Sequence, residues 1–216
     1  MISYRKLFSF ITNVLIIIFT LIGTIIMFTH SGNGTGLTSS GIGNFKYFTV
    51  LSNEFCGIVA ILQLRRDLWG DGKRLTKTKL VAASCVTLTF LVVACFLAPA
   101  YPDLNLYQHA NLWFHLIVPL VAIADFLIMK TDGKIPFLAT LLAAVPSAVY
   151  GYAYLINILL NGVGAWPDTN DWYGFLNWGA FASVAIFMGI VFANWLAAVI
   201  LRFLSNLTNQ RKRKKH

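Results

Sequence analysis

Long apolar segments alternate with short polar segments along the whole chain. A helix needs about 20 predominantly apolar residues to cross a hydrocarbon core of about 30 Å, and six segments meet this requirement. They are Phe8–Phe28, Phe45–Leu64, Leu80–Ala98, Ala110–Met129, Phe137–Leu159 and Gly174–Phe203. The pattern therefore predicts an all-α fold, a polytopic membrane bundle of six transmembrane helices that occupies residues 1–204.

The composition excludes an ordinary soluble domain. Hydrophobic residues make up 57% of the 216 residues and charged residues only 12%, whereas a soluble domain is about half apolar and about a quarter charged. The three cysteines fall inside predicted spans without the spacing of metal ligands. The sequence also contains no nucleotide-binding motif. We therefore expect neither a metal nor an organic cofactor.

The positive charges lie almost entirely on one side of the predicted bundle. The formal net charge is +9, and 16 of the 17 lysine and arginine residues fall in the tails and loops of one face, with only Lys46 on the other. Cytoplasmic loops carry such an excess, so both termini are predicted to be cytoplasmic. The loop between the second and third spans contributes six of these charges: Arg65, Arg66, Lys73, Arg74, Lys77 and Lys79.

The C-terminal residues 205–216 are predicted to form a basic cytoplasmic tail. A strongly basic segment can bind nucleic acid, but a cluster of lysine and arginine next to a membrane span binds anionic lipid headgroups without any further partner. We therefore expect anionic lipid at the basic cytoplasmic face and no nucleic acid. The sequence identifies no protein partner.

Three ionisable side chains lie inside predicted spans. Glu54 is in the second span, and His115 and Asp125 are in the fourth. A charged group near the bilayer centre costs at least about 2.5 kcal/mol, so each of them needs a partner, a neutral state or a function. Asp125 lies about 15 Å beyond His115 by helical rise. We expect Asp125 to pair with a polar or basic group in the cytoplasmic half.

Thr49 and His115 are predicted to lie at similar depth in two different spans. Both spans enter from the outer side, and helical rise places the two residues about 6 to 8 Å below the outer boundary. A hydroxyl and an imidazole at one depth are the minimum components of a nucleophile and its base. Pro119 lacks the N–H group that would bond the carbonyl of His115, so we expect a local kink beside the histidine.

Nearby polar groups can support such a pair. Asn53 follows Thr49 at i+4 and shares its helix face, whereas Glu54 is turned away from Thr49. If such a pair attacks a carbonyl group, the oxyanion that develops also needs hydrogen-bond donors. Asn53 and Asn111 are the nearest candidate donors in the sequence.

The same residues fit two other interpretations. Glu54, His115 and Asp125 can instead form a polar path across the bundle of a small transporter or channel. In a membrane assembly protein without catalysis, a threonine bonds the carbonyl of its own helix and a histidine links two helices.

The outer loop before the sixth span, Asn161–Tyr173, is acidic and aromatic. It contains Asp168 and Asp171 together with Trp166 and Trp172. Tryptophan is enriched at membrane interfaces, so anchoring in the interface accounts for these two tryptophans.

The segment that opens the second span resembles a family signature. Phe45-Lys46-Tyr47-Phe48-Thr49-Val50-Leu51-Ser52-Asn53 is similar to the aromatic-Lys-Tyr-x-Thr-x-Leu-x-Asn signature of the androgen-induced and androgen-dependent tissue-factor-regulating membrane proteins. His115 falls in the span in which that family keeps its histidine. The six-span layout is most similar to the prokaryotic relatives of the family.

This resemblance implies an integral membrane threonine hydrolase that cleaves lipid esters, such as fatty acid esters of hydroxy fatty acids. Thr49 would be the nucleophile and His115 the general base, acting on a membrane lipid or lipid-like substrate near the outer leaflet. The prokaryotic relatives imply a bacterial cytoplasmic membrane. The outer loops and the residues that flank the histidine differ from the family pattern, so the resemblance leaves the substrate open.

Overall fold

The structure is a computed structural model that describes residues 4–30, 41–69, 73–100, 102–129, 131, 133–165 and 169–213, the last four of these by their backbone alone. Within these ranges the chain is helical and contains no strand. Six helices of the described part are long and apolar enough to cross a membrane. The chain is therefore a multi-pass membrane protein.

The first two spans are single helices, α1 (Tyr4–Thr29) and α2 (Phe48–Trp69), and the short 3₁₀-helix η1 (Gly41–Lys46) precedes α2. The third span joins α3 (Thr76–Val92), the π-helical turn η2 (Val93–Leu97) and α4 (Ala98–Ala100). The fourth joins α5 (His109–Leu112), the π-helical turn η3 (Trp113–Ile117) and α6 (Val118–Ile128). The fifth is η4 (Phe137–Thr140) with α7 (Leu141–Asn161), and η5 (Phe175–Trp178) precedes the last helix, α8 (Ala180–Arg213).

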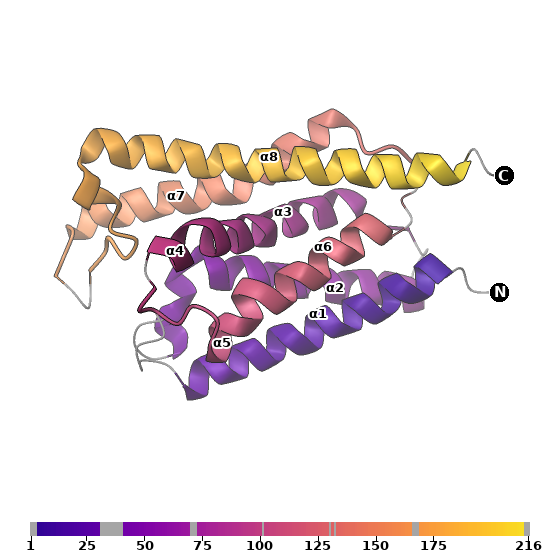
Figure 1. Cartoon of the computed structure of the whole chain (residues 1–216), viewed down its shortest axis with the longest axis horizontal. Coiled ribbons are helices and arrows are strands. Elements are labelled where there is room, and N and C mark those ends of the chain that lie inside the picture. The colour runs from indigo at the N-terminus through magenta and orange to yellow at the C-terminus, as the bar shows by residue number, and fades with distance from the viewer. Residues whose placement is uncertain are drawn as a thin grey trace.

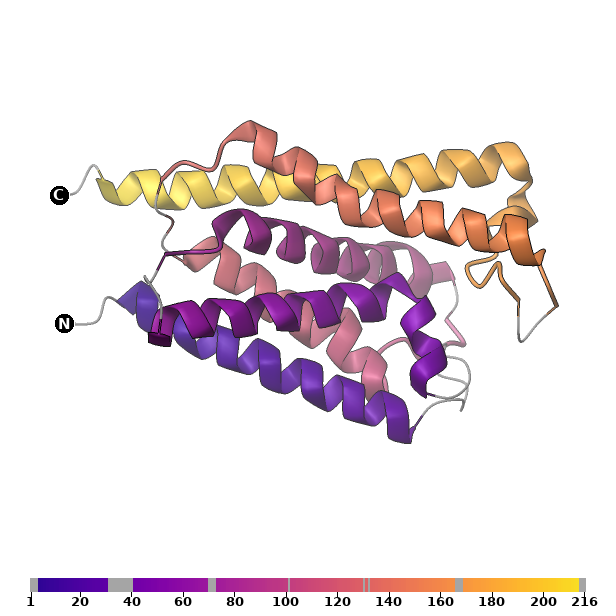
Figure 2. The same cartoon turned by 180° about the vertical axis from the view of Figure 1, so that it is seen from behind.

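Four helices form the main bundle and two more pack against one side of it. α1, α2, α3 and α6 contact one another in a ring, whereas α7 and α8 pair and lie against α3 (Figures 1 and 2). Gly151 of α7 allows a close approach within this pair, because a Cβ atom at this position would lie 1.8 Å from the ring of Phe187. The central helix, α3, is the most buried span.

The start of α1 and the end of α8 lie at the same end of the bundle (Figure 1). This arrangement follows from an even number of spans. We call this end the inner end and the opposite end the outer end. Both α2 and α5 begin at the outer end, as the predicted topology requires.

All six predicted spans are confirmed, but two of them start later than predicted. The second starts at Phe48 because the residues before it form a 3₁₀-helix. The sixth starts at Ala180, because Gly174 and Gly179 have φ angles of 66° and 84°, in the left-handed region that glycine adopts without strain. At its other end, α8 passes the predicted boundary at residue 204 and extends to Arg213.

The third span starts earlier than predicted, and this changes the role of one lysine. Lys79 was assigned to the loop before the span, but it lies in the first turn of α3 and is only 5% exposed. Its placement in a cytoplasmic loop is therefore wrong. The lysine belongs to the interior of the bundle, where its ammonium group requires a partner.

Candidate functional site

Thr49 lies at the outer end of α2, in the first turn of the helix, and is half-buried. The side chain of Asn53, one turn further in, donates hydrogen bonds to two carbonyl oxygens, that of Thr49 at 2.8 Å and that of Phe114 at 2.9 Å. Phe114 directly precedes His115 on η3. Asn53 therefore ties the helix of Thr49 to the turn that carries His115, and the two helices are neighbours.

The π-helical turn η3 places His115 in the protein interior. Val118 follows this turn and directly precedes Pro119. Its N–H group donates to the carbonyl of Trp113, five residues earlier. The predicted local distortion beside the histidine is therefore present, as a π-helical turn, a feature often found at functional sites. His115 is 6% exposed.

The imidazole of His115 is oriented by a backbone carbonyl. Its Nδ1 atom lies 2.7 Å from the carbonyl oxygen of Leu106, in the segment that leads into α5. A carbonyl oxygen only accepts hydrogen bonds, so Nδ1 carries the proton and donates it. In the neutral ring, Nε2 then holds the lone pair and can accept a proton. The described contacts thus give His115 the tautomer that a general base needs.

The amide of Asn53 lies between the backbone of Thr49 and the turn that carries His115. Its Nδ2 atom bonds the Thr49 carbonyl and the Phe114 carbonyl at the same time, so these two carbonyl oxygens lie close together. Within the described residues, no hydrogen bond joins the Thr49 hydroxyl to the imidazole.

The two asparagines proposed as oxyanion donors have different surroundings. The two amide hydrogens of Asn53 are committed to the carbonyls of Thr49 and Phe114, so Asn53 has no donor left and acts by positioning its neighbours. Asn111 is 1% exposed and lies one turn before His115. Its role as an oxyanion donor stays a prediction from the sequence.

Aromatic side chains of the outer loop close over the start of α2. The Tyr173 hydroxyl accepts a hydrogen bond from the Phe48 N–H group at 2.9 Å, and burial holds the pKa of this phenol well above its usual value of 10. Tyr150 of α7 donates to the carbonyl of Lys46 at 2.6 Å, and Trp172 donates to the Tyr150 hydroxyl at 3.1 Å. The loop therefore covers the residues that directly precede Thr49.

Membrane-interface anchoring alone does not account for Trp172, because its indole N–H group bonds within the protein. Asp171 fixes the same loop: its carboxylate accepts hydrogen bonds from the Tyr154 hydroxyl and from the backbone N–H groups of Phe175 and Leu176. Trp166 and Asp168 lie outside the described residues.

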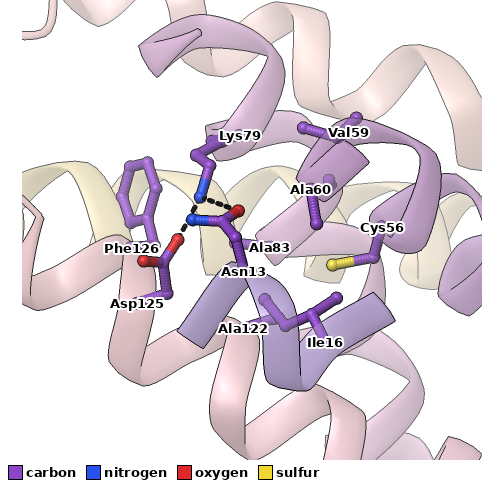
Figure 3. A pocket seen from close by; sticks show the side chains of 11 residues that line it. Asn13, Ile16, Cys56, Val59, Ala60, Lys79, Ala83, Ala122, Asp125 and Phe126 are labelled. Atoms are coloured by element: carbon purple, nitrogen blue, oxygen red, sulfur yellow. Dashed lines mark hydrogen bonds and ion pairs between the residues drawn. The ribbon is translucent and has the colours of Figure 1, made fainter. Parts of the chain in front are cut away.

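A second polar cluster lies near the inner end. Lys79 of α3 forms a buried ion pair with Asp125 of α6 and donates a hydrogen bond to Asn13 of α1 at 2.8 Å. The three side chains point toward one another (Figure 3). Thr12 adds a hydrogen bond of 2.6 Å to Asp125. Asp125 thus pairs with a basic group in the inner half, as its depth predicted.

This inner cluster continues toward the inner end of the bundle. Asn13 donates to Ser9, the Ser9 hydroxyl accepts from Arg74 at 3.3 Å, and Arg74 forms an ion pair of 3.0 Å with Asp67. A cavity of about 10 Å³ adjoins Lys79 and Asp125. This volume is close to the minimum for a single water molecule.

The residues of the predicted polar path have separate partners. Glu54 accepts a hydrogen bond from Thr24 of α1, His115 bonds Leu106, and Asp125 bonds Lys79. Among the described residues, no hydrogen bond or ion pair links these three side chains to one another. The polar groups form two separate clusters rather than one chain across the bundle: an outer cluster of Asn53, His115 and Tyr173 around Thr49, and the inner cluster around Lys79 and Asp125.

Several residues of both clusters were not identified from the sequence as members of a site. They are Thr12, Asn13, Lys79, Tyr150, Asp171 and Tyr173. Lys79 has a signal in the sequence, since it lies within one residue of a predicted span. The tyrosines have none, because their partners are backbone groups of a distant helix. No protein-family model, curated protein or solved structure matches the chain.

Proposed function

We propose that the protein is an integral membrane hydrolase of lipid esters, with Thr49 as the nucleophile and His115 as the general base. The observation that carries this proposal is the hydrogen bond from His115 Nδ1 to the Leu106 carbonyl, on a turn that Asn53 ties to α2. It leaves Nε2 as the proton acceptor, and a base held in one tautomer by a third group is typical of nucleophilic catalysis. The resemblance of the Thr49 segment to a family of membrane threonine hydrolases supports the same assignment.

In the first half-reaction, the Thr49 hydroxyl attacks the ester carbonyl carbon and His115 Nε2 takes the hydroxyl proton. The tetrahedral intermediate carries its negative charge on the former carbonyl oxygen. The start of α2 favours this charge, because the N-terminus of a helix carries a partial positive charge. Collapse of the intermediate breaks the bond to the alcohol, which leaves with the proton from His115. The acyl group remains on Thr49.

In the second half-reaction, water attacks the acyl-threonine while His115 Nε2 accepts one of its protons. Collapse of the second intermediate breaks the bond to Thr49 Oγ1, which takes the proton back from His115. The products are a carboxylic acid and an alcohol, and Thr49 and His115 return to their starting states. The substrate enters from the outer leaflet, near which Thr49 lies, in the cytoplasmic membrane of a bacterium.

An activity-based probe tests this proposal on the detergent-solubilised full chain. We expect an alkyl fluorophosphonate to form one adduct, located on Thr49 by intact and peptide mass. Thr49→Ser should keep the adduct, whereas Thr49→Val, which replaces the hydroxyl with a methyl group, should abolish it. His115→Ala should slow labelling at least about 100-fold, since a general base contributes about 10²- to 10⁴-fold.

Thr87→Val is the matched control, because the Thr87 hydroxyl bonds the carbonyl of Ala83 in its own helix. It should label at the wild-type rate and hydrolyse p-nitrophenyl octanoate normally. Glu54→Gln should do the same, since Glu54 faces Thr24 of α1. Folded wild-type protein that neither labels nor hydrolyses esters would rule out the hydrolase.

The buried pair of Lys79 and Asp125 favours a second candidate function, the transport of a proton or small cation. Ionisable residues inside a membrane bundle often mark ion pathways, and the inner cluster reaches from Asp125 to Asp67 near the inner end. Under this proposal, Asp125→Asn abolishes dye-reported proton flux in proteoliposomes while Thr49→Val leaves the flux unchanged. If the pair is purely structural, Asp125→Asn should lower thermal stability, and the wild-type protein should show no proton flux.

A further inference from the structure

Asn44 is a fully buried side chain whose polar atoms have no partner. It lies in η1, it is 0% exposed, and neither its Oδ1 nor its Nδ2 makes a hydrogen bond within the described part of the chain. Buried polar groups in native proteins are almost always hydrogen-bonded, so an isolated one indicates a missing water, ion or ligand. A complete buried amide without a partner therefore marks a place where a polar ligand can bind.

The backbone places Asn44 close to the outer cluster. The Tyr47 N–H group donates to the carbonyl of Asn44 at 3.1 Å, and the Leu51 N–H group donates to the carbonyl of Tyr47 at 3.2 Å. The second of these bonds closes the turn that contains Thr49. Asn44 is thus one short helical turn ahead of the nucleophile's own turn.

Packing brings the same segment next to the base. The Tyr47 ring, which follows Asn44 by three residues, lies in a buried cluster with Val50 and with Phe114, the neighbour of His115. η1 also contacts both α1 and α2. Asn44 therefore lies directly before the first turn of α2, against α1, and three residues before a ring that packs on the neighbour of His115.

The chemistry of the site requires a donor that Asn53 does not supply. Both amide hydrogens of Asn53 are bound to backbone carbonyls, whereas the amide of Asn44 makes no hydrogen bond to any described residue. An oxyanion formed by attack of Thr49 needs donors that are already oriented and shielded from water. A buried asparagine amide without a competing acceptor has these properties.

We propose that Asn44 is a catalytic residue whose Nδ2 group donates a hydrogen bond to the carbonyl oxygen of the bound ester and to the oxyanion that forms from it. This inference rests on the proposed hydrolase function. It predicts that the ligand of Asn44 is an ester carbonyl, and that Asn44 lowers the barrier to attack without taking part in proton transfer.

The test compares Asn44→Leu, which preserves side-chain size, with Asn194→Leu. Asn194 is also 0% exposed, but its Nδ2 group bonds the carbonyl of Ala143 and the hydroxyl of Ser147. For p-nitrophenyl octanoate, we expect Asn44→Leu to lower kcat at least about 100-fold, as loss of one oxyanion donor does, with a much smaller change in KM. Its thermal midpoint should equal or exceed that of the wild type, because no internal hydrogen bond is lost.

Asn194→Leu should show the opposite behaviour, a lower thermal midpoint and nearly unchanged kcat in the folded protein. Wild-type kcat in Asn44→Leu, while Thr49→Val is inactive, would overturn the role of Asn44 and leave the hydrolase proposal intact. A thermal midpoint that falls as far as in Asn194→Leu would make Asn44 a structural residue. Failure of the wild type to hydrolyse any ester would overturn both proposals together.

Discussion

Asn53 of α2 donates a hydrogen bond of 2.9 Å to the carbonyl oxygen of Phe114, one residue before His115. The π-helical turn explains why a carbonyl is available there, since η3 and Pro119 interrupt the regular ladder of helix hydrogen bonds. A single amide thus fixes how two spans that are distant in sequence meet, and it also bonds the carbonyl of Thr49. The register between the proposed nucleophile and the proposed base depends on this residue.

Replacement of Asn53 by alanine should therefore lower both stability and activity. The buried Phe114 carbonyl oxygen loses its side-chain donor, and such a loss costs about 1–3 kcal/mol. The Thr49 carbonyl loses one side-chain bond but keeps the backbone N–H donor of its own helix. Hydrolysis should fall as well, because the turn of His115 is no longer held against α2. Thermal unfolding in detergent and ester hydrolysis measure the two effects.

Ser52→Ala is the matched control on the same helix. Like Asn53, Ser52 bonds the carbonyl of Thr49, at 3.0 Å, but its other contact is with Thr89 of α3 at 3.1 Å rather than with η3. This variant should lose about 1 kcal/mol, the net value of one hydrogen bond, and keep most of its activity. Equal loss of activity in the two variants would show that the contact with Phe114 has no special role.

His115→Asn should separate the structural bond of the histidine from its chemistry. The asparagine amide can take the place of Nδ1 and donate to the Leu106 carbonyl, but it offers no group in the place of Nε2. We expect a thermal midpoint close to that of the wild type and an inactive enzyme.

His115→Leu should be inactive and also less stable by about 1–3 kcal/mol, because the Leu106 carbonyl then has no donor. Measurable hydrolysis in His115→Asn would contradict the assignment of His115 as the base.

Tyr173→Phe should loosen the cover over the start of α2. The Phe48 N–H group would lose its acceptor at 2.9 Å, at a cost of about 1 kcal/mol. Hydrolysis should decrease, because the first turn of α2 positions Thr49. Tyr152→Phe is the control, since that tyrosine is 66% exposed on α7. Loss of its hydroxyl should change neither the stability nor the rate of hydrolysis. Hydrogen exchange at the amides of residues 48–50 provides a direct measurement.

The pair of Lys79 and Asp125 should show strong coupling in a double-mutant cycle. Removal of one partner leaves an uncompensated buried charge and costs about 3–5 kcal/mol, so Lys79→Met or Asp125→Leu alone should be poorly stable. The double variant Lys79→Met/Asp125→Leu should recover most of the loss, because no charge remains. Additive losses in the thermal unfolding of the double variant would show that the two charges do not interact.

The sequence by itself predicted the number and the approximate location of the spans. Membrane thickness sets the length of an apolar helix, and the excess of lysine and arginine on one side sets a preferred orientation; both are local properties that can be counted along the chain. The sequence also identified Thr49, His115 and Asp125 as residues that need an explanation, since polar groups in a membrane interior are costly. It did not predict the start of α3, which turned a loop residue, Lys79, into the buried partner of Asp125.

Only the tertiary structure decided which groups meet. The tautomer of His115 depends on the Leu106 carbonyl, and the bond from the Asn53 amide to the Phe114 carbonyl depends on the position of η3. The cover over the start of α2 depends on Tyr173, which is distant in sequence. These partners are backbone atoms, and every residue except proline has the same backbone donor and acceptor. A sequence pattern therefore cannot mark them. Their positions follow from helix packing, which joins segments that the sequence keeps apart.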